Sequence, residues 1–136
     1  MGVILRAAVL INRYQCVNFK RNINLISVAM SELFKKILKL IKNKDLVVSN
    51  HGYDELSEDN IWLKDLLASA EFGVVVEDYP DYPKGPCVLI LQQDSNGAPI
   101  HVVWGIPKGR QSPAVLITAY RPDRSIWSED FTRRKT

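Results

Sequence analysis

Two histidines, His51 and His101, carry the only imidazoles of the 136-residue chain. Imidazole titrates near neutral pH, so either ring could act as a general acid or base. His101, Thr118 and Tyr120 fall at alternate positions of two runs that are typical of neighbouring strands, so their side chains can share one face of a sheet. An imidazole, a hydroxyl and a phenol in one patch could hold a phosphate and transfer a proton.

Both histidines also have a purely structural interpretation. A strand histidine beside a threonine is often a hydrogen-bonded, half-buried residue, and this is an equal alternative for His101. His51 opens the polar stretch HGYDEL, a short helical turn in which it could equally be a cap or a surface residue. The sequence leaves these alternatives open.

Two pairs of charged residues lie in expected loops. Lys108 and Arg110, in GIPKGR, could contact RNA phosphates, and the alternative is a solvated hairpin tip. Asp78 and Asp81, in EDYPDYP, could bind Mg²⁺, although a charged turn is the favoured interpretation. With two histidines, no close Cys or His pair and no phosphate loop, we expect no metal site and no cofactor.

The elements that must position these residues begin with helices. A helix is expected from Ser31, an N-cap candidate, with apolar residues at helical spacing between 33 and 41 and lysines on the other face. The lysine face could bind RNA or a membrane surface, but a core-packing helix is favoured. Residues 45–50 are expected to form a link. A further helix is expected from Ser57 to Gly73, with Trp62 on its buried face.

From Gly73 onward the pattern changes to strands. The expected strands are 73–79, 87–93, 99–106 and 114–121, joined by turns rich in Pro, Gly and Asn. Trp127 and Phe131, in the polar tail, can pack back on the core. The sequence therefore predicts an α+β fold with N-terminal helices on a four-stranded antiparallel sheet.

Composition fits one domain. Hydrophobic residues make up 46% of the chain and charged residues 24%, a balance typical of globular proteins. Two cysteines fit a reducing cytoplasm, and no apolar run approaches a membrane span, so we expect a cytoplasmic protein without a membrane partner. Residues 1–29 carry four basic side chains and no acidic one, with broken apolar runs. We expect 1–29 to be an upstream extension or a disordered arm, and 30–136 to be the domain.

An ordered set of motifs resembles a bacterial family. His51 before a short helix, VVVEDYPDYPKGP, a strand with IHVVWG, and ITAYRPD followed by Trp127 are similar to the domain-of-unknown-function family four-two-five-eight, over about residues 45–131. The resemblance implies a fold of the RelE, barnase, EndoU and colicin-like ribonuclease superfamily. It also implies metal-independent RNA cleavage by a toxin, and a cognate antitoxin as protein partner.

Carried onto this chain, the family pattern marks His51, His101, Thr118 and Tyr120 as catalytic residues. Many members have Arg four residues after the first histidine, where this chain has Glu55, which would repel a phosphate but could act as a general base.

Two hypotheses follow. The first is a toxin-type endoribonuclease with His51 and His101 as the acid–base pair and Lys108, Arg110 and Arg121 neutralising phosphate charge. The second is a non-catalytic protein-binding module that keeps the ribonuclease-toxin fold. The near-neutral charge of 30–136 and the presence of Glu55 favour the second.

Overall fold

The computed structural model describes residues 23–135, with side chains from Glu32 onward. Helices and strands follow one another in the order α2 (Ile23–Lys42), β1 (Leu46–Val48), α3 (Asn50–Glu58), α4 (Leu63–Ser69), the 3₁₀ turn η1 (Ala70–Phe72), β2 (Val74–Tyr79), β3 (Cys87–Gln93), β4 (Pro99–Gly105) and β5 (Ala114–Tyr120). The expected α+β class is confirmed.

The described strands form one sheet of five strands in the order β1-β5-β4-β3-β2. β2 to β5 make the expected antiparallel meander, but β1 pairs parallel with β5, from Leu46 opposite Ala114 to Val48 opposite Leu116. The prediction of a purely antiparallel four-stranded sheet is therefore wrong. Three residues are too few to show alternation, so the segment expected to be a link carried no strand signal.

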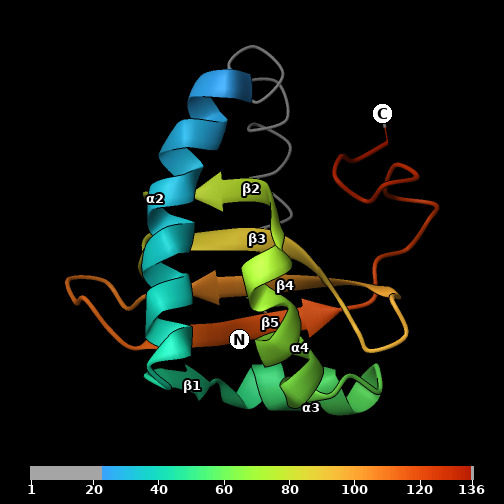
Figure 1. The fold of residues 1–136 in the computed structure, drawn as a ribbon, viewed down its shortest axis with the longest axis horizontal. Helices are drawn as coiled ribbons and strands as arrows, with labels where there is room; N and C mark the ends of the chain where they lie inside the picture. The colour runs from blue at the N-terminus through green and yellow to red at the C-terminus, as the bar shows by residue number, and fades with distance from the viewer. Residues whose placement is uncertain (1–22, 136) are drawn as a thin grey trace.

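The sheet has two covered faces. The helices lie on one face, where α2 and α4 cross the strands in Figure 1 and where Ile37, Leu66 and Trp104 are buried in the main core. On the other face, Trp127 and Phe131 of the C-terminal segment (residues 121–135) pack with sheet residues in a second apolar cluster. The expected docking of the tail on the core is confirmed, and it is this second face that carries most of the predicted site.

Two expected helix boundaries are corrected. α2 begins at Ile23 and crosses the expected domain start, so Ser31 lies inside the helix instead of capping it. The part of the predicted N-terminal extension that precedes Ile23 lies outside the described residues. The helix expected from Ser57 begins only at Leu63, because α3 continues to Glu58, and Trp62 is 64% exposed instead of buried.

The lysine face of α2 is solvated. Phe34 and Ile37 are buried in the core, while Lys35 and Lys36 are exposed, as the core-packing interpretation predicts. Within the described part of the chain, no helix is both long enough and apolar enough to cross a membrane.

Candidate functional site

Pairing between β4 and β5 brings three predicted residues onto one sheet face. His101 lies directly opposite Tyr120, and Val103 lies opposite Thr118. Alternation along β5 is broken just beyond the second pair, since the register shifts between Val103 and Trp104 and places Leu116 opposite Trp104, toward the helices. Strict alternation along β5 would place Leu116 on the same face as Thr118 and Tyr120, and the register shift turns it to the opposite face. The expected shared face of the three polar residues is nevertheless confirmed.

His101 is completely buried and hydrogen-bonded at both ring nitrogens. Nε2 lies 2.8 Å from the carbonyl oxygen of Phe131, and Nδ1 lies 3.2 Å from the hydroxyl oxygen of Tyr120. A carbonyl only accepts, so Nε2 carries the hydrogen. Burial lowers the pKa of His101 to about 4, so the ring is neutral at pH 7 and Nδ1 accepts from the Tyr120 hydroxyl. His101 and Tyr120 thus form an oriented donor–acceptor pair.

The C-terminal segment covers this pair. The Trp127 ring meets the His101 ring edge-on, with 4.4 Å between centroids, and the guanidinium carbon of Arg134 lies 4.5 Å from the Trp127 centroid. Trp127 is 3% exposed, whereas Tyr120 is only half-buried. Tyr120 is therefore the member of the pair that reaches toward solvent.

Glu77 is a buried acid on the same face that sequence reasoning did not single out. It lies opposite Leu89, which lies opposite Val103 in the next strand. Burial raises the pKa of Glu77 to about 8, opposed by the charge of Arg134 and by the nearby Tyr79 hydroxyl. A charged residue in the apolar run GVVVEDY was the signal that could have found it.

Two buried polar atoms on this face make no direct hydrogen bond within the described part of the chain. They are the hydroxyl of Thr118 and Nε of Arg134. Buried polar groups are normally paired, so such atoms need an explanation, and a bound ligand is one. We call Glu77, His101, Thr118, Tyr120 and Arg134 the sheet-face cluster.

His51 lies apart from this cluster. Ser49 caps α3 by accepting from the amide of Gly52 and donates its hydroxyl to the Ile117 carbonyl, which anchors the start of α3 to β5. His51 Nε2 lies 3.3 Å from Glu55 Oε1, without the alignment of a hydrogen bond. Burial raises the pKa of Glu55, and His51 partly opposes that shift.

No hydrogen bond, ion pair or ring contact among the described residues joins His51 to His101. The predicted acid–base pair is not brought together as a contact. His51 forms a separate, half-buried pair with Glu55.

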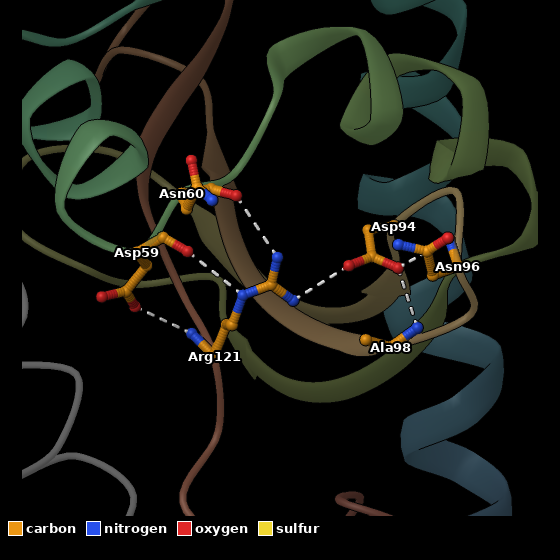
Figure 2. Close-up of polar contacts among 6 residues, drawn as sticks. All are labelled: Asp59, Asn60, Asp94, Asn96, Ala98 and Arg121. Atoms are coloured by element: carbon orange, nitrogen blue, oxygen red, sulfur yellow. Dashed lines mark hydrogen bonds and ion pairs between the residues drawn. The ribbon is translucent and has the colours of Figure 1, made fainter.

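Arg121, expected to neutralise phosphate charge, is held by the protein itself (Figure 2). Its Nε and Nη2 donate to the backbone carbonyls of Asp59 and Asn60, and its Nη1 lies 3.1 Å from an Asp94 carboxylate oxygen. Asp94 in turn accepts from the amides of Asn96 and Ala98 in the β3–β4 turn, which lowers its pKa. Arg121 thus ties the end of α3 to this turn.

We expect Arg121→Ala to lower the melting temperature by a few degrees, because three side-chain contacts are lost together. Arg133→Ala removes the same charge from an exposed position and should leave the melting temperature unchanged. Thermal unfolding by circular dichroism measures both. Equal melting temperatures would show that the Arg121 contacts do not stabilise the fold.

The remaining predicted residues lie in loops. Lys108 and Arg110 are exposed in the β4–β5 loop. Asp78 is half-buried and its pKa rises to about 6, mainly by burial, while Asp81 is exposed. In residues that the structure describes, no group of three or more His, Cys, Asp or Glu side chains is arranged to hold a metal.

Fold and site together define a small α+β protein with helices on one face of a mixed five-stranded sheet and a polar cluster on the other. The family model described as "Domain of unknown function (DUF4258)" matches residues 48–121, more than half of the chain, so the chain belongs to this family. Comparisons with curated proteins and with solved structures found no match. The matched range spans His51, Glu77, His101, Thr118 and Tyr120.

Proposed function

We propose that this protein is a metal-independent, toxin-type endoribonuclease whose proton-transfer groups lie in the sheet-face cluster. The observation that carries the proposal is the His101–Tyr120 pair, with the buried, unpartnered Thr118 hydroxyl and Arg134 Nε on the same face. Oriented proton-transfer groups beside a hydroxyl and a guanidinium Nε that make no hydrogen bond suit a phosphodiester. RNA and a cognate antitoxin are the partners that go with this function.

The chemistry needs no nucleophile from the protein. The RNA 2′-oxygen attacks the adjacent phosphorus, the O2′–P bond forms and the P–O5′ bond breaks, which leaves a 2′,3′-cyclic phosphate. The Tyr120 oxygen takes the 2′-hydroxyl proton while its own proton passes to Nδ1 of neutral His101. Glu77 keeps its proton at neutral pH and is the proposed donor to O5′, with Arg134 facing the phosphate charge.

Access to the whole cluster requires the C-terminal segment to move. His101 and Thr118 are both 0% exposed, and Trp127 lies against the His101 ring. With the C-terminal segment packed on the sheet as the structure shows it, Tyr120 and Arg134 are half-buried and the other three residues of the sheet-face cluster are buried. RNA binding therefore goes with displacement of Trp127 and its neighbours from the sheet.

The test is cleavage of total RNA in EDTA by the full chain and by Tyr120→Phe. Loss of the hydroxyl breaks the proton path, so we expect cleavage to fall at least about 100-fold. Tyr53→Phe makes the same change at a residue that is 59% exposed on α3, and should cleave like the parent. Full activity of Tyr120→Phe, with loss in His51→Ala, would overturn the assignment and place the chemistry at the His51–Glu55 pair.

A non-catalytic protein-binding module is the second candidate. The complete burial of His101 and Thr118 and the contacts that hold Arg121 favour it, since each of these residues then has a structural role. Expression distinguishes the two: a ribonuclease toxin arrests growth unless its antitoxin is supplied, whereas a binding module does not. No growth arrest and no cleavage by folded protein would favour the module.

A further inference from the structure

A pocket of about 170 Å³ lies at one end of the second sheet face. Its walls come from the β2–β3 loop, the end of β4 and the start of β5, and include Tyr82, Gly105, Val115 and Ile117. Gly105 lies opposite Cys87 and Val115, two residues along β4 from Val103, so the pocket continues the face that carries the sheet-face cluster. A cavity of this size is too small for a drug-sized ligand but suits one planar ring.

The two loops around the pocket form one continuous rim. The amide of Lys108 donates to the carbonyl of Lys84 at 3.1 Å, and the amide of Ile106 donates to the carbonyl of Pro86 at 3.0 Å. At Gly85 φ is +130°, and an added Cβ would lie 2.2 Å from the Ile106 carbonyl oxygen, so this close approach requires glycine. The rim is therefore formed before any ligand binds.

The rim is positively charged and its charges are free. Lys84, Lys108 and Arg110 are exposed, and none of them forms an ion pair in the part of the chain that the structure describes. Lys36 of α2 contacts Gln111 of the same rim, and Asp81 is the acidic side chain on the β2–β3 loop. In Figure 1 the β2–β3 and β4–β5 loops leave the same end of the sheet, beside α2. Arg121, in contrast, is already paired.

We infer that this pocket holds one unpaired base of a single-stranded RNA, with the rim lysines on the flanking phosphates. Tyr82 and the prolines supply apolar contact for the base, and the free cations match the phosphate charge. The inference rests on the proposed function, since it places the bound RNA on the same sheet face as the sheet-face cluster. It adds Lys84 and Tyr82 to the residues that contact RNA.

The test is fluorescence anisotropy of the full chain with a labelled 2′-O-methyl RNA hexamer, which lacks the nucleophile and cannot be cleaved. We expect Lys84→Ala to weaken binding three- to tenfold and to lower the slope of log K against log salt by about 0.7, the loss of one single-strand phosphate contact. Lys64→Ala removes the same charge from α4 and should bind like the parent.

Two further measurements test the base pocket: variants that change the pocket, and a duplex RNA whose bases are paired and cannot enter it. Val115→Phe places a ring in the pocket, and Tyr82→Leu removes the aromatic wall if the first variant does not fold. Either should abolish the preference for the hexamer over its duplex, in which the bases are paired. Equal binding of hexamer and duplex by the parent, or equal effects of Lys84→Ala and Lys64→Ala, would overturn the inference.

The two proposals can fail separately. If the 2′-O-methyl hexamer binds in a way that depends on Lys84 and Val115, but ordinary RNA is not cleaved, the base-pocket inference is supported and the proposed ribonuclease function is contradicted. If RNA is cleaved and neither Lys84→Ala nor Val115→Phe changes the rate, the base-pocket inference is contradicted and the proposed ribonuclease function stands.

Discussion

Trp127→Ala is expected to lower the free energy of unfolding by about 3–5 kcal/mol, the usual loss for a buried large-to-small change at an aromatic residue. Trp127 is 3% exposed and contacts both the His101 ring and the Arg134 guanidinium, so its removal leaves a cavity and loosens the C-terminal segment. Urea unfolding measures the loss. Ile126→Ala changes a neighbour that is 46% exposed, and should shift stability by less than about 0.5 kcal/mol.

The same variant tests the cover over His101. Because burial is the main cause of the lowered His101 pKa, opening the segment should move that pKa from about 4 toward 6.5. NMR titration of the imidazole signals measures the shift, and Trp127→Phe, which keeps an aromatic ring, serves if the alanine variant is unfolded. An unchanged His101 pKa in a folded Trp127 variant would show that Trp127 does not control its burial.

Glu77→Gln is expected to flatten the pH dependence of stability above pH 5. In the folded protein Glu77 keeps its proton up to about pH 8, whereas in the unfolded chain it ionises near 4.5. Between these values the unfolded state binds fewer protons, so the free energy of unfolding falls as pH rises. Glutamine is neutral in both states, so the fall between pH 5 and 8 should shrink by about 2–4 kcal/mol.

His101 and Asp78 also make stability depend on pH, and they do so equally in the parent and in Glu77→Gln. Because the pKa of His101 is lowered, the free energy of unfolding falls as pH drops from 6.5 toward 4, the opposite direction to the Glu77 effect. Because the pKa of Asp78 is raised, the free energy of unfolding also falls as pH rises from about 3.8 to 6, the same direction as the Glu77 effect. Urea unfolding at pH 5, 6, 7 and 8 isolates the Glu77 contribution by difference. Glu129→Gln, at an exposed position, should follow the parent curve. Identical slopes for Glu77→Gln and the parent would mean that Glu77 is ionised in the folded protein.

Local patterns predicted most of the second sheet face. The run CVLILQQ matches β3 residue for residue, and alternation along β4 and β5 predicted that His101 shares a sheet face with Thr118 and Tyr120. The apolar character of Trp127 and Phe131 in a polar tail predicted their docking. These features are properties of a few consecutive residues, so the amino-acid sequence by itself determined them.

Contacts between distant segments decided the rest. The parallel pairing of β1 depends on β5, 68 residues further along, and the register shift beside Val103 that reorients Leu116 arises only when β4 and β5 pair. In the sequence Arg121 is a basic residue like Lys108, yet in the structure its guanidinium donates hydrogen bonds to Asp59, Asn60 and Asp94. The raised pKa of Glu77 comes from burial within the fold. Pairing partners and desolvation are set by residues far apart in the chain, and only the tertiary structure brings those residues together.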